Sequence, residues 1–147
     1  MVQPLLQPLI FLAAAAIAWR IGGEPEKRGA QILILVIVIG LLRRTFFGIS
    51  SDQVDPIGLT SDVLAFIAFV AIAMFAWRIW PICAASLQLL AVMAHVVRGF
   101  EIEIDPVAYF VMRGTPTFTI WLVILIGALN HARLKRAHAS IPSWRNW

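Results

Sequence analysis

The sequence predicts an all-α protein, a single membrane domain of about five transmembrane helices. Of its 147 residues, 61% are hydrophobic and only 14% are charged, and the mean hydropathy is +0.85. A soluble domain is roughly half apolar and about a quarter charged. The charges also gather between long uncharged stretches. Together these observations exclude a soluble enzyme core and a nucleic-acid module, and the single cysteine excludes an internal disulfide.

Cutting the chain at its charged residues gives five predicted spans, because a crossing helix needs about 20 mostly apolar residues. The first is the least regular, with Pro4 and Pro8 near its start. Ala13 and Ala16 offer a signal-peptide alternative, but no basic residue precedes Arg20, which favours a retained helix. The predicted spans are residues 4–21, 29–48, 56–77, 79–99 and 114–132.

The second span is short of uncharged residues, with only 14 from Gly29 to Leu42. It reaches across a bilayer if Arg43 and Arg44 extend to the headgroups while Phe47 completes the helix. The alternative is a re-entrant or partly buried helix.

The distribution of charge predicts an orientation with the N-terminus outside and the C-terminus in the cytoplasm. Five spans in this orientation place eight of the twelve Lys and Arg residues inside, in agreement with the positive-inside rule. Most acidic residues fall in the outer loops, and five of the six tryptophans fall on the inner side. We divide the chain into the membrane domain, residues 1–135, and a basic cytoplasmic tail, residues 136–147.

Proline marks the predicted helix starts and turns. Asp55-Pro56 and Asp105-Pro106 each place a capping carboxylate before a proline suited to the first helical turn. After the second, we expect a short interfacial helix over 106–113, with the last span beginning at Thr115-Pro116. The segment Arg78-Ile-Trp-Pro81 predicts a tight hairpin that makes the third and fourth spans antiparallel neighbours.

The fourth predicted span carries a polar stripe. Ala84, Gln88, Ala91, His95 and Arg98 follow the three- and four-residue spacing of one helical face. Because Gln and His are costly in lipid, this face should point into the bundle. Gln88, His95 and Arg98 form either a ligand, proton or cofactor site or polar contacts that hold helices together, and the second interpretation is favoured.

Asp62 lies one to two turns inside the third predicted span. An intramembrane acid is a functional candidate. However, the predicted topology places Arg44 and Arg98 at about the same depth, so we expect an ion pair in the outer leaflet between Asp62 and one of these arginines. A proton or ion site is the alternative.

No metal or cofactor is predicted. His95 and His131 differ in depth by roughly 20 Å at 1.5 Å per residue, so one chain does not bring both to a haem iron. Glu101 and Glu103 alternate along a loop without a partner motif, and Cys83 is interpreted as a small apolar filler.

The tail predicts contact with lipid. Arg133, Lys135 and Arg136 lie just beyond the last span, where basic residues attract anionic headgroups, and Trp144 and Trp147 would lie at the interface. A solvated flank is the alternative interpretation.

The segment Arg78–Pro81, followed by Gln88, His95 and residues 105–109, resembles a pattern in small uncharacterised bacterial multi-span integral-membrane proteins. The resemblance implies no activity. We expect a bacterial inner-membrane protein that is a non-enzymatic accessory or assembly subunit of a larger complex. Its expected partners are the lipid bilayer, a possible second copy or other subunits, and no nucleic acid. The alternatives are a small oligomeric transporter or channel, and a membrane enzyme or cofactor protein with a site near His95.

Overall fold

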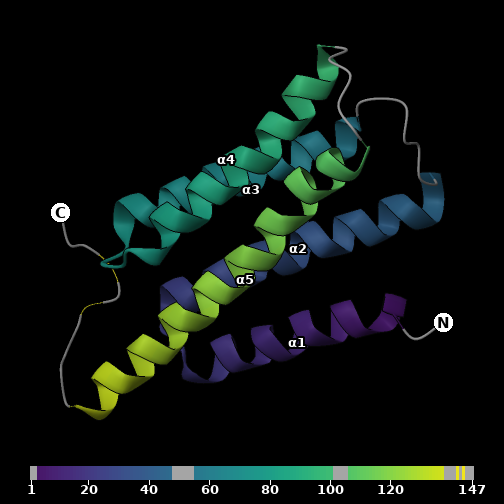
Figure 1. Ribbon diagram of the computed structural model, residues 1–147. Helices are drawn as coiled ribbons and strands as arrows, with labels where there is room; N and C mark the ends of the chain where they lie inside the picture. The colour runs from purple at the N-terminus through teal and green to yellow at the C-terminus, as the bar shows by residue number, and fades with distance from the viewer. Residues whose placement is uncertain (1–2, 48–54, 101–105, 138–141, 143, 145–147) are drawn as a thin grey trace.

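The computed structural model describes residues 3–47, 55–100, 106–137, 142 and 144; for residues 3–9, 47, 106–110 and 113 it describes the backbone alone. The predicted all-helical fold is confirmed over these residues (Figure 1). The five helices are α1 (Gln3–Ile21), α2 (Glu24–Phe47), α3 (Pro56–Phe75), α4 (Trp80–Gly99) and α5 (Pro106–Arg136).

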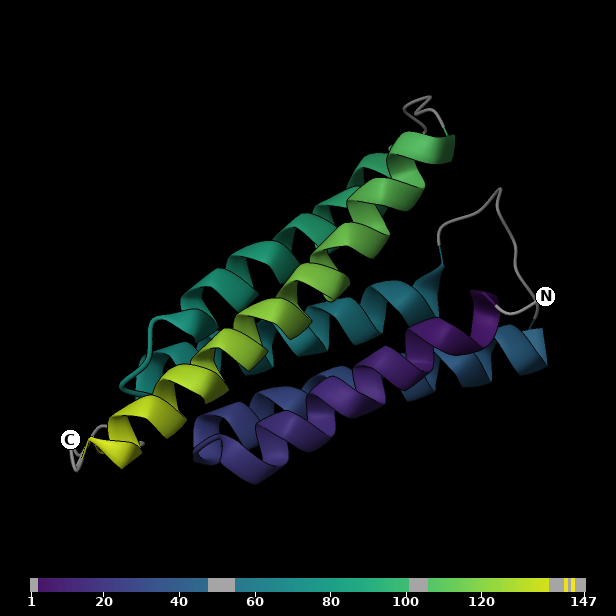
Figure 2. The same ribbon diagram turned by 60° about the horizontal axis from the view of Figure 1, so that its bottom comes forward.

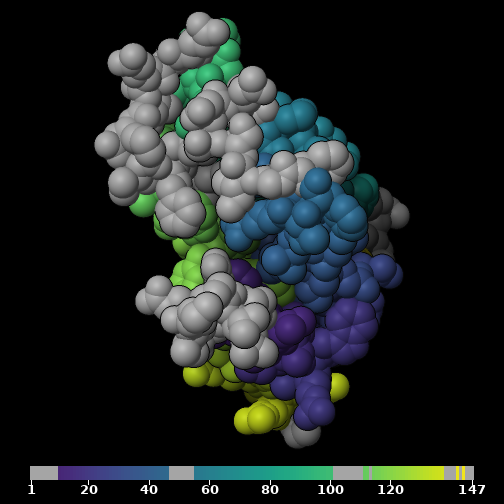
Figure 3. All heavy atoms as spheres, turned by 90° about the vertical axis from the view of Figure 1, so that its right-hand side faces the viewer, coloured from purple at the N-terminus to yellow at the C-terminus, as the bar shows by residue number. Residues whose placement is uncertain are grey.

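The helices form a ring in chain order. Each helix packs against the next, α5 closes the ring on α1, and α2 also contacts α5. The most extensive contacts are those of α4 with its two neighbours, α3 and α5. Figures 1 and 2 show α1 and α2 as a pair that runs at an angle to α4 and α5. In Figure 3, α2 lies at the surface between α3 and α1.

Four of the helices are long and apolar enough to cross a membrane. The qualifying segments are Glu24–Phe46, Pro56–Phe75, Trp80–Gly99 and Gly114–Arg136. The described apolar part of α1, Ile10–Ile21, is shorter, so the first predicted span stays a prediction. Large apolar side chains face outward on these helices, as a lipid-facing surface requires: Leu35, Leu64 and Ile126 are each about 60% exposed.

Helix α2 begins five residues before the predicted span. Glu24 and Glu26 lie in its first turn, where carboxylates favour the positive end of the helix dipole, and Pro25 suits the first turn because it lacks an N–H. At the other end the helix continues through Arg43 and Arg44 to Phe47. Its 24 residues correspond to about 36 Å at 1.5 Å per residue, which is long enough to cross a bilayer.

Helix α5 corrects the predicted break at Thr115-Pro116. It runs without interruption for 31 residues, so no separate interfacial helix covers 106–113. Pro116 is buried inside this helix and removes only one backbone hydrogen bond, a loss that membrane helices tolerate when neighbouring helices pack around it. Arg136, the first residue of the predicted tail, is the last residue of α5.

The prolines place the other helix starts as predicted. Helix α3 begins at Pro56 after Asp55, although the Asp55 side chain makes no capping hydrogen bond. Its carboxylate instead lies 2.7 Å from Nη1 of Arg43 on α2. The predicted hairpin is confirmed, since α3 ends at Phe75 and α4 begins at Trp80. Asp105 lies outside the described residues.

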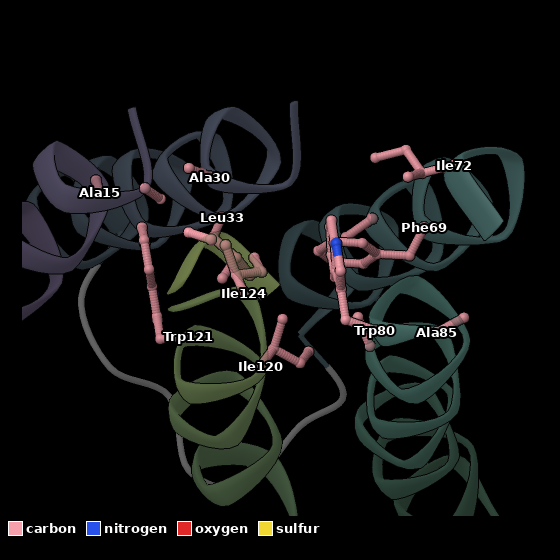
Figure 4. Packing of buried hydrophobic residues seen from close by; sticks show 14 of the residues in the cluster. Ala15, Ala30, Leu33, Phe69, Ile72, Trp80, Ala85, Ile120, Trp121 and Ile124 are labelled. Atoms are coloured by element: carbon pink, nitrogen blue, oxygen red, sulfur yellow. The ribbon is translucent and has the colours of Figure 1, made fainter. Parts of the chain in front are cut away.

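The buried apolar core centres on Trp80 (Figure 4). Phe69 on α3 meets the Trp80 ring edge-on, with ring centroids 6.5 Å apart. Glycines on two other helices make room for the indole. A Cβ atom added at Gly29 would lie 2.5 Å from the Trp80 ring, and one added at Gly127 would lie 2.7 Å from it. Trp80 therefore fills a slot between α2 and α5 that larger residues would close.

Trp144 returns to the bundle. Its backbone forms an isolated antiparallel bridge with Ala76, just after α3, and its half-buried side chain packs against the core cluster. The sequence predicted a position at the lipid interface for this residue. The structure gives this residue a protein neighbour, its contact with lipid stays a prediction, and Trp147 lies outside the described residues.

Candidate functional site

Three polar side chains meet inside the bundle between α3 and α4. Gln88 Nε2 donates to Oδ1 of Asp62 at 3.0 Å, and His95 Nε2 lies 3.2 Å from Oδ2 of the same carboxylate. Asp62 is 6% exposed, and Gln88 and His95 are each 1% exposed. All three belong to helices that qualify as membrane spans. We call this group the Asp62 cluster.

The hairpin between α3 and α4 brings these residues to one level. Asp62 lies six residues after the start of α3, and His95 lies four residues before the end of α4. Because the two helices run in opposite directions and pack closely, these positions face each other. Ala84 and Ala91, on the same stripe of α4, are also fully buried, so the predicted inward orientation of this face is confirmed.

The predicted ion pair of Asp62 with Arg44 or Arg98 is wrong. Within the part of the chain that the structure describes, neither arginine lies in ion-pair distance of the Asp62 carboxylate. Arg44 is exposed on α2, and Arg98 follows His95 by almost one turn toward the end of α4. The acid therefore finds its partners deeper in the bundle, on the face that already carried Gln88 and His95.

The contact between His95 and Asp62 is a hydrogen bond of an imidazole nitrogen with a carboxylate oxygen. Contact between a carboxylate oxygen and an imidazole nitrogen requires one proton between them, carried either by His95 or by Asp62. The second carboxylate oxygen is occupied by the Gln88 amide, which fixes the orientation of the acid. The cluster consequently joins two candidate spans through buried hydrogen bonds and holds a proton at the contact.

A second buried network surrounds Glu26, whose side chain has no exposed surface. Its Oε2 accepts the backbone N–H of Gly23 at 2.9 Å, and its Oε1 accepts the indole N–H of Trp80 at 2.9 Å and Nε–H of Arg78 at 3.2 Å. Sequence reasoning missed this network, because the second predicted span begins at residue 29 and leaves Glu26 outside it. The signal was the acid-rich first turn before a long apolar run.

Arg78 extends the Glu26 network to α5. Its Nη2 lies 2.9 Å from Nδ1 of His131. A guanidinium group donates only, so Nδ1 must accept, and the neutral His131 ring carries its proton on Nε2. The turn between α1 and α2, the α3–α4 hairpin and α5 are thus tied together at the end of the bundle opposite the Asp62 cluster.

A groove lies between α2 and α3, beside the Arg43–Asp55 pair. Its volume is about 350 Å³. The Thr60 and Ser61 hydroxyls donate to the backbone carbonyls of Pro56 and Gly58, so they offer no free proton to a ligand. The groove is therefore apolar in character. It is lined by Ile39, Pro56, Ile57, Thr60, Ser61 and Leu64.

The remaining predicted residues that the structure describes take part in neither buried network. Among the described residues, no group of three His, Cys, Asp or Glu side chains is placed to hold a metal ion. Cys83 is exposed on α4 and does not fill a gap in the core, which corrects its interpretation as a packing residue. Arg133, Lys135 and Arg136 are exposed on the last turns of α5. Glu101 and Glu103 lie outside the described residues.

Comparison of this chain with protein-family models, curated proteins and solved structures gave no match.

Proposed function

We propose that this chain is a non-enzymatic accessory or assembly subunit of a larger membrane complex. The observation that carries the proposal is that the buried carboxylates of this chain bond to other helices and turns of the same chain. The carboxylate of the Asp62 cluster bonds to side chains of the neighbouring helix, and that of Glu26 bonds across three other segments. Both networks connect helices of this chain. Neither borders the apolar groove between α2 and α3.

The proposal includes a topology. We place all five helices, including α1, across a bacterial inner membrane, with the N-terminus outside and the C-terminus in the cytoplasm. The support is the excess of basic residues on the end formed by the α1–α2 turn, the α3–α4 hairpin and the end of α5. Cysteine accessibility tests it: with Cys83 replaced by Ser, a cysteine introduced at Ala137 should react with an impermeant maleimide only after the inner membrane is opened.

The role as a subunit is tested by purification from native membranes. We expect a tagged full-length chain, solubilised in a mild detergent, to co-purify with a fixed set of membrane proteins after chemical cross-linking. A matched sample expressing the Glu26→Ala variant, whose bundle is weakened, should lose those partners. Recovery of the wild-type chain alone, with no cross-linked partner at native expression, would contradict the proposal.

One observation favours a second candidate function, proton-linked transport by an oligomer. The Asp62–His95 contact is a carboxylate–imidazole pair inside two candidate spans, a residue combination used in membrane proton relays. Proteoliposomes containing the wild-type chain and an internal pH dye would then show proton flux that Asp62→Asn and His95→Gln abolish. Equal dye responses from wild-type, variant and empty vesicles would exclude this candidate.

A further inference from the structure

Exposed basic side chains from three helices meet at one end of the bundle. Arg20 lies in the last turn of α1, Arg28 lies in the second turn of α2, and three more lie in the last two turns of α5. All five are exposed. We call this surface the basic end; its residues are Arg20, Arg28, Arg133, Lys135 and Arg136.

Close packing of the α1–α2 turn on α5 brings these residues together. A Cβ atom added at Gly22 would lie 3.4 Å from Cβ of Ala128, and one added at Gly23 would lie 3.2 Å from the His131 ring. Figures 1 and 2 both show this turn beside the C-terminal part of α5. The Glu26 network, which includes Gly23 and reaches His131 through Arg78, locks the arrangement.

The charges of the basic end are not balanced within the described protein. Glu24 pairs with Lys27 at 3.2 Å, and Glu26 pairs with Arg78, so both nearby acids are already engaged. Over the described residues, no Asp or Glu lies in ion-pair distance of the five cations. At the opposite end, by contrast, Arg43 is paired with Asp55.

The position of the basic end indicates what balances it. It lies where α1, α2 and α5 leave the apolar region. Helices α2 and α5 are long enough to span a membrane, and α1 spans it in our proposed topology. Trp19 and Trp77, at this same end, are about half exposed, as indoles at a lipid headgroup layer are. We propose that the basic end is a binding site for the headgroups of anionic phospholipids in the adjoining leaflet. Phosphate oxygens of the lipid accept hydrogen bonds from the guanidinium and ammonium groups of the three helix ends.

The site is tested on the full-length chain in an uncharged detergent, with phosphatidylglycerol and phosphatidylcholine as probes. Native mass spectrometry counts the lipids retained, and the melting temperature is followed at low and high salt. We expect preferential retention of phosphatidylglycerol and a stabilisation that high salt removes. Each of Arg20→Gln and Arg136→Gln should weaken retention about fivefold, since a basic residue near an anionic surface contributes on the order of a factor of five.

Arg44→Gln is the matched control, because Arg44 is an exposed arginine at the opposite end of the bundle. It should leave the retention of phosphatidylglycerol unchanged. Equal retention of the two lipids, or an equal loss in Arg44→Gln, would overturn the proposal. Stabilisation by soluble polyglutamate but not by phosphatidylglycerol would also overturn it, and would assign the surface to an acidic protein.

Discussion

Trp80 donates its indole N–H to Oε1 of Glu26 at 2.9 Å, and the indole ring separates the backbones of Gly29 and Gly127. One side chain therefore meets both the buried acid and the apolar core. The acid also accepts from Arg78, whose positive charge compensates it out of contact with water. This junction joins α2, α4, α5 and the turn that precedes α2, and Phe69 of α3 packs on the same indole ring. We expect the stability of the bundle to depend on it.

Replacing Glu26 by Ala should lower the free energy of unfolding by about 1–3 kcal/mol, because the buried N–H groups of Gly23 and Trp80 lose their acceptor and the part-buried Arg78 loses its acid. Unfolding in mixed micelles with increasing sodium dodecyl sulfate measures the change. Glu24→Ala is the control. Glu24 pairs with Lys27 on the exposed side of the same turn and should cost less than about 1 kcal/mol. If the two variants lost the same free energy of unfolding, the stability of the bundle would not depend on this junction.

Gly127→Ala should destabilise the bundle by about 1–3 kcal/mol, because the added methyl group overlaps the Trp80 ring. Gly40→Ala is a matched control within a helix, since a Cβ atom there meets nothing within 4 Å. The control should be neutral or slightly stabilising. The same micellar unfolding measurement compares them. If Gly127→Ala matched Gly40→Ala, the slot around Trp80 would be looser than described.

A double-mutant cycle of Asp62→Asn and His95→Gln should give a coupling energy of about 0.5–3 kcal/mol, because His95 Nε2 and Asp62 Oδ2 are in direct contact at 3.2 Å. The control cycle pairs Asp62→Asn with Ser86→Ala, an exposed position on α4 whose hydroxyl bonds within its own helix. That cycle should be additive. The structural role would be contradicted if Asp62→Asn left the melting temperature unchanged while removing an assayable activity. The cluster would then be a working site and not a helix–helix contact.

Trp144→Ala should cost about 1–2 kcal/mol, less than the loss of a fully buried aromatic side chain, because Trp144 is only half buried against the core. The control Ile79→Ala changes a side chain that is 80% exposed in the adjacent hairpin. Limited proteolysis should show the α3–α4 hairpin of Trp144→Ala cut faster than that of the control. Identical digestion would mean that the C-terminal segment does not protect the hairpin.

Helix positions could be predicted where charge and proline mark their ends. The bounds of the predicted spans 56–77 and 79–99 agree with those of α3 and α4 to within two residues. They could be predicted because Asp55-Pro56 and Arg78–Pro81 interrupt an otherwise apolar sequence. The same reasoning failed at Pro116, because a proline inside a membrane helix is held by its neighbours and a single-sequence pattern does not contain those neighbours.

The sequence predicted the position of two members of the Asp62 cluster but not the partner of the third. The stripe with Gln88 and His95 was correctly placed facing inward, but Asp62 was matched to arginines because opposite charges attract. Counting residues from the hairpin would have placed Asp62 level with His95. Counting residues would not have predicted the Glu26 network. Its formation depends on the fit of Trp80 between Gly29 and Gly127, which are 98 residues apart in the sequence.

The hairpin that unites Asp62 with its partners also constrains how the protein is made. Asp62 is synthesised 26 residues before Gln88 and 33 residues before His95. Entering lipid alone, α3 would carry an acid in its second turn, and the cost of such a transfer reaches about 2.5–3.5 kcal/mol at a helix centre. The cost falls once α4 supplies the amide and the imidazole. Helices α3 and α4 are therefore expected to leave the insertion machinery together, as one unit of biogenesis.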